Sequence, residues 1–441
     1  MNRYIARAQE ILDTKTPELP KEQLKRHVAS YMDRRKEFTG LAEQHGSPLY
    51  VLEPAVLRDR ARAFVSAFAA ELPDVSVFYA VKSNSFPLVL RTLVEEGLGL
   101  DVSSGLELQL ALECGAKEIV FSGPGKTDDE LRLALDHADR VIVLMDSPGE
   151  MARLERLAAG CRTTIRTGLR LTTNPRGLWR KFGVPLTDLA RMLRDAIQCS
   201  YVKFSGLQFH TSWNLIPASQ SRFIRDLGQT LRDLPGQTRS AIQFIDIGGG
   251  YWPPQGEWLR AKGTSAGALR QMLLPDACKV DTHYRLSAMP IEKFASEIGK
   301  AIREHLPEEL SCKICMEPGR WLCNDAMHLL MTVVDRKADD LVITDAGTNA
   351  IGWEQFETNY APVINMTRQS LKEQRCDILG CLCTPHDVWG CAYWGKDIQP
   401  GDILLIPTQG AYTYSLRQEF IKPIPAVVTL DKNAVVWRTI R

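Results

Sequence analysis

The sequence lacks the features of a membrane-bound, secreted or nucleic-acid-binding protein. No stretch approaches the ~18 consecutive apolar residues of a membrane span, and the charged N-terminus has no apolar core of a secretory signal. Neither sign of charge is in excess, because 54 lysines and arginines are interspersed with 53 aspartates and glutamates. No basic face for nucleic acid or a membrane surface is therefore indicated. We expect a cytoplasmic protein that acts on small molecules.

Paired cysteines of the kind that form a disulfide framework or a zinc site are also lacking. The 11 cysteines are scattered, mostly in apolar segments, which is typical of reduced thiols. Cys312 and Cys315 lie in a strand-like run, where positions three apart face opposite ways. A second group, within residues 376–391 and including His386, is the better zinc candidate but has no C-x-x-C pairs. We therefore expect no metal site.

Strand-like and helix-like segments alternate through the middle of the chain. Eight short apolar runs are separated mostly by segments that repeat apolar residues at helical spacing. Eight such repeats over about 240 residues predict a parallel (β/α)8 barrel, whose usual length is ~250 residues. A doubly wound open sheet is the structural alternative. The predicted strands are 75–81, 99–102, 118–122, 140–145, 168–172, 205–210, 244–248 and 313–317.

The 441 residues exceed what one hydrophobic core usually holds, so we expect two domains and an extension. Residues 1–45 predict a helical extension of two helices. Residues 46–322 hold the barrel with its leading strand and helix. Residues 323–441 show strand-like runs with little helical period, which predicts a mostly β domain. The connection between strands seven and eight, residues 250–311, is unusually long, and a connection of that length is either functional or disordered.

Polar and small residues gather at the ends of the predicted strands, the face at which barrel enzymes react. Lys82 follows the first strand, although a lysine there is usually a solvated surface residue. The three glycines 248–250 follow the seventh and let backbone N–H groups approach an anion, although a tight turn is the simpler explanation. Glu317 and Arg320 follow the eighth strand, which puts a carboxylate at the strand end and an arginine near the same anion. A salt bridge in a surface turn is the simpler explanation. His210 ends the sixth strand, where its ring could pack against a flat cofactor. The alternative is a buried histidine whose hydrogen bonds are made within the core. Together they indicate a pyridoxal phosphate site.

The same residues lie in motifs that resemble the fold-type III pyridoxal phosphate enzymes, in the group of diaminopimelate, ornithine and arginine decarboxylases. The motifs occur in family order from about residue 46 to residue 421. The resemblance implies an α/β fold, an alanine-racemase-like (β/α)8 barrel with a C-terminal mostly β domain, and a homodimer with shared active sites. The motifs are Tyr79–Asn84, Gly97–Glu107, Lys181–Gly183, Gly206–His210, Asp246–Gly250, Glu317–Arg320, Cys383–Asp387 and Gly410–Tyr412.

The resemblance also implies roles for individual residues around pyridoxal 5'-phosphate. Lys82 would bind the cofactor as a Schiff base, Glu317 would pair with its pyridine nitrogen, and His210 would stack on its ring. The glycines of the seventh strand, Arg320 and Tyr412 would hold the phosphate. These glycines are Gly248, Gly249 and Gly250, and the other implied cofactor-binding residues are Asp101, Glu107, Arg170 and Gly319. The segment from His210 to Trp213 departs from the usual histidine-x-glycine-serine, which leaves Thr211 and Ser212 as candidates for the phosphate-binding hydroxyl.

Two further residues are implied to act across the dimer. Cys383 would come from the partner subunit and donate a proton after carbon dioxide leaves. Asp387 would pair with Lys181 of the other subunit. The catalytic set implied by the resemblance is thus Lys82, Cys383 and His210.

Departures from the family pattern bear on the substrate. Thr384 stands where diaminopimelate decarboxylases carry an acidic residue that binds a distal ammonium group. Residues 361–365 lack the arginine and tyrosine that grip the distal carboxylate. Losing a matched charge partner costs ~2–5 kcal/mol per pair, which disfavours diaminopimelate as the substrate. The missing partner of the distal ammonium group disfavours ornithine and lysine as well.

We therefore expect a decarboxylase of a larger or modified amino acid, such as a siderophore precursor or an amino acid linked to a carrier protein. The alternatives are diaminopimelate decarboxylase proper, an amino-acid racemase and a non-catalytic homologue. Racemases of this fold carry an arginine near the pyridine nitrogen and a tyrosine in place of Cys383. Non-catalytic relatives usually lose Lys82 or Cys383, and this chain keeps both.

Overall fold

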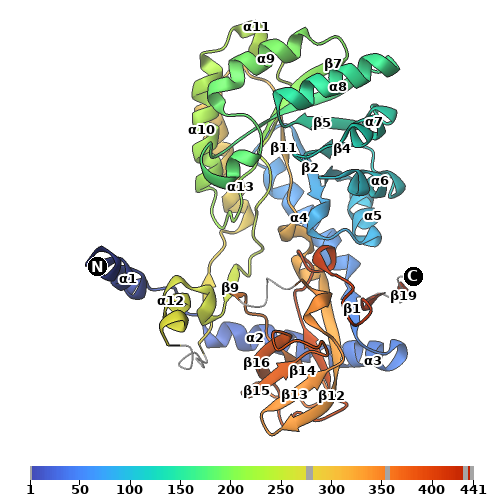
Figure 1. Ribbon diagram of the computed structural model, residues 1–441, viewed down its shortest axis with the longest axis vertical. Coiled ribbons are helices and arrows are strands. Elements are labelled where there is room, and N and C mark those ends of the chain that lie inside the picture. The colour runs from blue at the N-terminus through green and yellow to red at the C-terminus, as the bar shows by residue number, and fades with distance from the viewer. Residues whose placement is uncertain (1, 275–281, 353–357, 431–435, 438–441) are drawn as a thin grey trace. The chain divides into compact units, whose positions relative to one another are not determined.

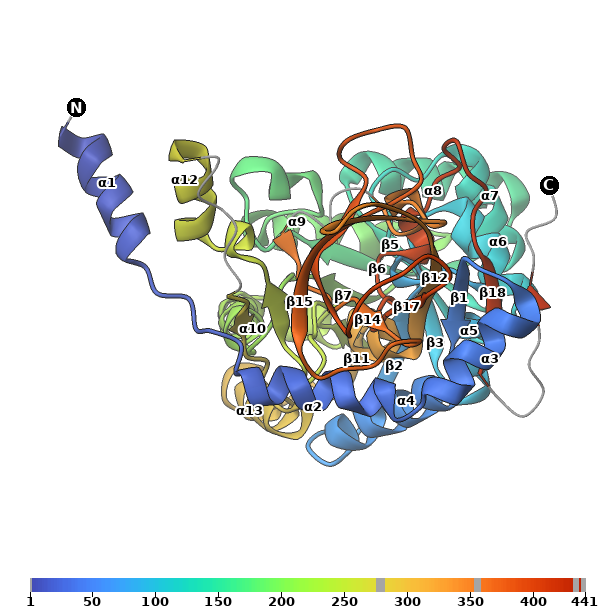
Figure 2. The same ribbon diagram turned by 90° about the horizontal axis from the view of Figure 1, so that it is seen from below.

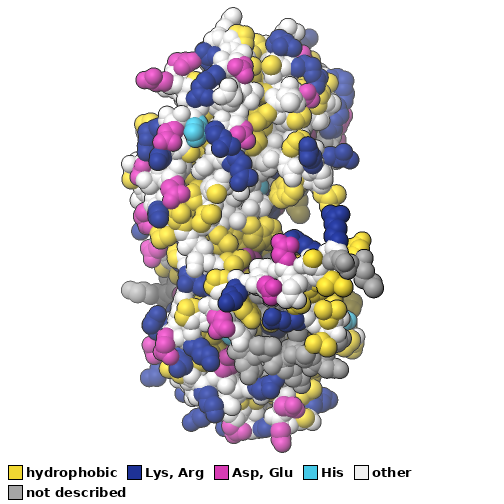
Figure 3. Space-filling model, turned by 90° about the vertical axis from the view of Figure 1, so that its left-hand side faces the viewer, with side chains coloured by type: hydrophobic (Ala, Val, Ile, Leu, Met, Phe, Trp, Pro, Cys, Tyr) yellow, Lys and Arg dark blue, Asp and Glu magenta, His cyan; other side chains and the backbone are white. Residues whose placement is uncertain are grey.

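The computed structural model describes residues 2–274, 282–352, 358–430 and 436–437 and divides into two compact units. The first, called here the barrel unit, comprises residues 57–254 and 288–323. The second, called the β unit, comprises residues 1–56, 255–287 and 324–441. No helix among the described residues is long and apolar enough to cross a membrane. On the face shown in Figure 3, basic and acidic side chains are interspersed.

The barrel unit contains a closed barrel of eight parallel strands, in the order β11-β2-β3-β4-β5-β6-β7-β8 (Figure 1). The predicted alternation of strands and helices is therefore confirmed. The strands are mostly buried because helices cover the outside and side chains fill the interior. They are β2 (Val75–Ala80), β3 (Gly99–Val102), β4 (Ile119–Phe121), β5 (Val141–Met145), β6 (Ile165–Leu171), β7 (Val202–Phe209), β8 (Phe244–Asp246) and β11 (Lys313–Met316).

Helices between the strands begin where the sequence supplies hydrogen-bonding caps. Thr127 and Glu130 form a reciprocal capping box, and the Ser104 and Ser147 side chains each accept a backbone N–H three residues on. The helices that connect or flank the barrel strands are α4 (Pro54–Ala69), α5 (Pro87–Glu95), α6 (Gly105–Glu113), α7 (Asp128–Asp136), α8 (Pro148–Cys161), α9 (Leu189–Gln198), α10 (Ala218–Arg232), α11 (Gly236–Arg239), α13 (Ile291–His305) and α14 (Arg320–Cys323).

The β unit is built on a nine-stranded sheet in the order β13-β15-β16-β14-β17-β12-β1-β18-β19, which confirms the predicted mostly β domain. Its long strand β12 (Met327–Ala338) pairs with β1, β13 and β17. The other strands are β1 (Leu49–Leu52), β13 (Leu341–Thr344), β14 (Ile364–Asn365), β15 (Glu373–Leu379), β16 (Val388–Trp394), β17 (Ile403–Ile406), β18 (Ala426–Thr429) and β19 (Val436–Trp437).

The N-terminal residues 1–56 fall within the β unit. Strand β1 inserts between β12 and β18, where Leu49 lies opposite Leu330 and Ala426 (Figure 2). Three helices rather than two precede it, and buried residues of α2 and α3, including Val28 and Phe38, join the core of the same unit. They are α1 (Asn2–Asp13), α2 (Lys21–Met32) and α3 (Arg35–His45).

Part of the long connection between strands seven and eight also belongs to the β unit. It contains β9 (Glu257–Leu259), α12 (Ser265–Leu273) and β10 (Tyr284–Leu286), and β9 pairs antiparallel with β10. Trp258 of β9 is buried in the core of the β unit. The sequence pattern did not indicate this division, because the contacts join segments far apart in the chain.

Candidate active site

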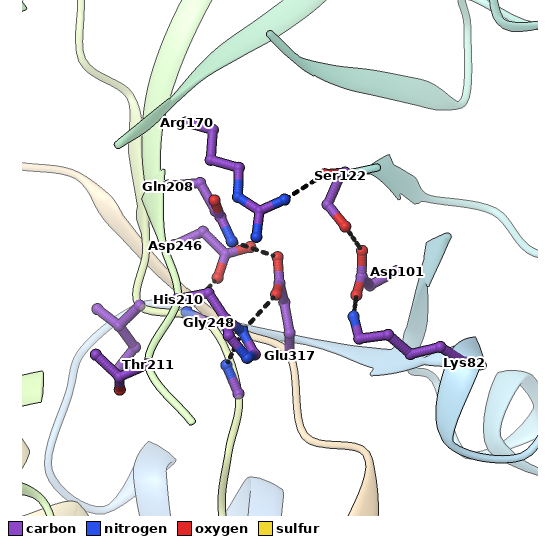
Figure 4. Close-up of polar contacts among 12 residues, drawn as sticks. Lys82, Asp101, Ser122, Arg170, Gln208, His210, Thr211, Asp246, Gly248 and Glu317 are labelled. Carbon is purple, nitrogen blue, oxygen red and sulfur yellow. Dashed lines mark hydrogen bonds and ion pairs between the residues drawn. The ribbon is translucent and has the colours of Figure 1, made fainter. Parts of the chain in front are cut away.

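Lys82 lies just after β2, in a short turn at the carboxyl end of the barrel strands (Figure 4). Its Nζ donates a hydrogen bond to Oδ2 of Asp101 on β3 at 2.8 Å, and its side chain is 35% exposed. Asp101 is buried and also accepts a hydrogen bond from the Ser122 hydroxyl. Burial and the charge of Glu317 raise the pKa of Asp101, although Lys82 opposes them. The ammonium group is thus held at one place while it remains accessible.

Glu317 lies at the end of β11 and is buried. Its Oε1 accepts a hydrogen bond from Nε2 of Gln208 at 3.1 Å, and its Oε2 lies 3.5 Å from Nδ1 of His210. Burial would raise the pKa of Glu317, but the contact with His210 and the charge of Lys82 outweigh that effect and lower it. Glu317 is therefore an anion that can face a protonated ring nitrogen.

The three glycines after β8 form a turn in which Gly248 (φ +68°) and Gly250 (φ +87°) are left-handed. A Cβ atom on Gly249 would lie 2.3 Å from the Glu317 carbonyl oxygen, so the turn has no room for a side chain. The Gly249 N–H donates to Nδ1 of His210 at 3.1 Å. Among the described residues, the Gly250 N–H has no acceptor, as an anion-binding turn requires.

Asn214 holds this turn in place and was not predicted from the sequence. It is buried, its Nδ2 donates to the Gly249 carbonyl at 2.8 Å, and its N–H donates to the Gly250 carbonyl at 2.9 Å. Its side chain also bonds the Thr211 hydroxyl, which is therefore engaged within the loop. Trp213 adopts a left-handed backbone (φ +55°) and is 65% exposed. In the sequence, the only indication of this role is that an asparagine, Asn214, directly follows Trp213 in the loop after β7.

Arg320 and its neighbour Gly319 follow Glu317 in the barrel unit. The Arg320 guanidinium lies 4.6 Å from the ring centroid of Trp252, just beyond the glycine turn. A Cβ atom on Gly319 would lie 1.9 Å from the Ser83 hydroxyl, so a side chain there would displace that hydroxyl beside the lysine turn. These contacts place a cation on the segment after Glu317 and explain the glycine before it.

Two other predicted residues, Arg170 and Glu107, have well-defined local partners. Nη1 of Arg170 donates to the Ser122 carbonyl at 2.7 Å and lies 3.8 Å from Oδ1 of Asp146. Oε2 of Glu107 accepts the Ser103 N–H at 2.7 Å, and burial raises the pKa of Glu107. Both residues support the loops that carry the site.

Two of the predicted residues, Cys383 and Asp387, lie in the β unit. Cys383 is exposed, on a loop that Asp387 closes. Asp387 is buried, its Oδ1 accepts hydrogen bonds from the Thr348 N–H and hydroxyl at 2.7 and 2.9 Å, and its Oδ2 accepts the Leu382 N–H at 2.7 Å. Oδ2 accepts one hydrogen bond and Oδ1 accepts two, so the Oδ2 atom keeps a lone pair for one further donor.

The residues of the barrel unit together fit pyridoxal phosphate. They offer an accessible amine, a buried anionic carboxylate, an imidazole, a left-handed glycine turn and a nearby guanidinium. Tyr412 has a left-handed backbone (φ +58°) and belongs to the β unit. Among residues 2–274, 282–352 and 358–430, no three His, Cys, Asp or Glu side chains form a metal-binding group.

Residues 58–324 match the family described as pyridoxal-dependent decarboxylase, pyridoxal binding domain. The chain is 28% identical over 415 residues to diaminopimelate decarboxylase of Methanothermobacter thermautotrophicus, covering 90% of this chain and 89% of that protein. It is 27% identical over 420 residues to diaminopimelate decarboxylase of Bacillus subtilis, covering 89% and 88%.

Solved structures show the same fold. Diaminopimelate decarboxylase of Helicobacter pylori, complexed with L-lysine, has a TM-score of 0.74 at 22% identity and covers 90% of this chain and 95% of its own. Lysine/ornithine decarboxylase of Vibrio vulnificus, complexed with putrescine, has a TM-score of 0.70 at 22% identity and covers 90% and 98%.

Proposed function

The chain belongs to the family of pyridoxal-dependent decarboxylases, and on that premise we propose that it removes the α-carboxylate of an amino acid whose distal end differs from that of diaminopimelate. It is a carboxy-lyase, and pyridoxal 5'-phosphate is its cofactor. The observation that carries the proposal is the pairing of an accessible Lys82 amine with a buried, anionic Glu317 at the same end of the barrel.

The residues of the barrel unit bind and orient the cofactor. Lys82 would attach it, with Asp101 orienting the lysine, and Gly250 and Arg320 would hold its phosphate. Bound pyridoxal phosphate supplies an electron sink for the electron pair that remains on the α-carbon when carbon dioxide leaves. Glu317 keeps the pyridine nitrogen protonated, because an anion beside it stabilises the positive charge, and this strengthens the sink.

Cys383 of a second subunit protonates the α-carbon at the end of the reaction, in a homodimer with two shared active sites. The exposure of its side chain supports this role, because a residue that serves another subunit has to be presented at the surface. Asp387 keeps the Cys383 loop closed through its bonds to Thr348 and Leu382. Lys181, whose side chain is exposed after β6, would face this loop across the dimer.

The substrate is a larger or modified amino acid, such as a siderophore precursor or an amino acid linked to a carrier protein. Thr384 has no charge to bind a distal ammonium. Asn365 is fully buried, its side-chain oxygen accepts the backbone N–H groups of Thr367 and Arg368, and its amide donates to Asp402, so this side chain serves the β unit and carries no charge for a distal carboxylate. The diaminopimelate decarboxylases among its relatives make diaminopimelate decarboxylation the alternative.

The proposal is tested by measuring carbon dioxide release from a panel of substrates. The panel contains meso-diaminopimelate, L-ornithine, L-lysine, N-acylated and citrylated diamino acids, and amino acids linked to a carrier protein. We expect release from a modified or tethered amino acid and little from meso-diaminopimelate. Turnover of meso-diaminopimelate at ordinary enzymatic rates would contradict the substrate proposal but not the decarboxylase. Conversion of an L-amino acid to its D-form without carbon dioxide release would contradict the decarboxylase.

A further inference from the structure

Asp246 and Glu317 are two buried carboxylates on neighbouring strands of the barrel. Asp246 ends β8, where it lies opposite Gln208 of β7 and Cys315 of β11, and Glu317 follows two residues after Cys315. The exposed fractions of Asp246 and Glu317 are 0% and 2%. Figure 4 shows the two carboxylate groups side by side, with the Gln208 amide next to them.

The hydrogen bonds of Asp246 leave one of its oxygens unused. Oδ1 accepts the Gly248 N–H at 2.8 Å. Oδ2 is buried and has no donor among the residues that the structure describes. The Gln208 amide does not supply one, because its Nε2 donates to Glu317. As an anion, Asp246 would therefore hold an unsolvated charge beside a second carboxylate, which is strongly unfavourable.

The nearby cations are engaged with other groups. Lys82 pairs with Asp101 at 2.8 Å, and Arg170 bonds the Ser122 carbonyl and lies 3.8 Å from Asp146. None of the ion pairs formed by the described residues includes Asp246. Two buried carboxylates in contact cannot both be ionised without such a cation, so they share one proton.

Glu317 is the better anion of the two. It accepts the Gln208 amide, lies near His210, and in the proposed function faces a protonated pyridine nitrogen. We propose that Asp246 is a neutral carboxylic acid that donates its proton in a hydrogen bond from Oδ2 to Glu317. Asp246 is then a positioning residue: it holds the Glu317 carboxylate in one orientation and stabilises its charge.

The electrostatic surroundings agree with this assignment. Burial, followed by the charge of Glu317, raises the pKa of Asp246 well above its usual value, whereas the pKa of Glu317 is lowered. The other titratable groups near Asp246 are Asp101 on β3, Cys315 on β11 and Tyr251 beyond the glycine turn. All three are uncharged or anionic, so none of them would stabilise Asp246 as an anion.

The decisive variant is Asp246→Asn. The asparagine side chain keeps an oxygen for the Gly248 N–H and places an NH2 group where the acid would have its O–H. A neutral acid is thus replaced by a neutral donor of the same shape, and we expect cofactor affinity within about threefold of the unmodified protein. Asp246→Leu removes both bonds, and we expect about 10- to 100-fold weaker cofactor binding. Asp226→Asn, at a half-exposed aspartate of α10, is the matched control.

Two measurements are made on the full chain. The first is the equilibrium dissociation constant of pyridoxal phosphate for the three variants. The second is the infrared carbonyl stretch of un-ionised carboxylic acid in protein with 13C-labelled aspartate, recorded near neutral pH without cofactor. Asp246→Asn should remove one band from the spectrum, and Asp226→Asn should leave the spectrum unchanged.

The outcomes separate this inference from the proposed function on which it rests. If Asp246→Asn removes no band, or if it weakens binding as much as Asp246→Leu, Asp246 acts as an anion and the inference is wrong. If the Leu variant binds cofactor like the unmodified protein, Asp246 does not position Glu317. The infrared measurement needs neither activity nor a folded Leu variant, so failure of the decarboxylase assay leaves its result intact.

Discussion

Asn214 offers the most direct test of how the phosphate-binding turn is held. The Asn214→Ala variant removes the side-chain bonds to the Gly249 carbonyl at 2.8 Å and to the Thr211 carbonyl at 3.2 Å. It keeps the backbone bond to the Gly250 carbonyl. The turn should therefore stay connected to the loop after β7 but lose the side chain that determines its shape.

The size of the effect follows from the burial of Asn214, whose exposed fraction is 2%. Each hydrogen bond is worth ~1 kcal/mol net, and a buried carbonyl left without a donor costs ~1–3 kcal/mol. Two carbonyls are affected, and water entering the space of the lost amide would satisfy one of them in part. We expect the free energy of unfolding to fall by ~2–4 kcal/mol and cofactor binding to weaken by about tenfold or more.

The test combines urea unfolding of the cofactor-free protein with equilibrium binding of pyridoxal phosphate. Gln109→Ala, an amide-to-alanine change at an exposed position of α6, is the matched control and should change neither quantity. If Asn214→Ala binds the cofactor as tightly as the unmodified protein, the turn does not depend on this side chain. Lost stability with unchanged cofactor affinity would likewise refute a role in phosphate binding.

Four further predictions concern the site and the two units. Lys82→Ala should abolish the visible absorbance of lysine-bound cofactor, and a retained band would refute the attachment site. Cys383→Ala should lose turnover but keep that band. If active sites are shared between subunits, mixing the Cys383→Ala and Lys82→Ala variants should restore part of the activity, because a mixed dimer has one site with both residues intact. Lys126→Met leaves the buried Glu150, now 2.8 Å from Lys126 Nζ, without its partner and should lower the free energy of unfolding by ~3–5 kcal/mol in urea titrations. Burial lowers the pKa of His27 to about 4, so between about pH 6.5 and pH 4 the unfolded chain binds a proton that the folded chain does not. The free energy of unfolding should therefore fall as the pH drops through this range. If the free energy of unfolding of a His27→Phe variant falls by the same amount, His27 is not the cause.

The barrel could be predicted because its signal is local. Most of the eight strands are short and mainly apolar, and the segments between most of them repeat apolar residues at helical spacing. The β unit was predicted only in outline, and a strand such as β15 shows why, because it mixes polar and apolar residues without a clear apolar run. The short strand β1 was identified, but its place between β12 and β18 depends on pairing with residues almost 280 and 380 positions away.

In the candidate site, too, some features follow from local sequence and others depend on contacts between distant segments. Lys82, Glu317 and the three glycines could be expected at one face because the carboxyl ends of parallel barrel strands meet there. The sequence by itself thus determined the barrel and the chemical groups at its end. The tertiary structure decided which groups face each other: the register of β7, β8 and β11 brings Gln208, Asp246 and Glu317 together, and the loop after β7 directs Asn214 at the glycine turn. These contacts depend on strand register and loop conformation, which the order of residues along one segment does not reveal.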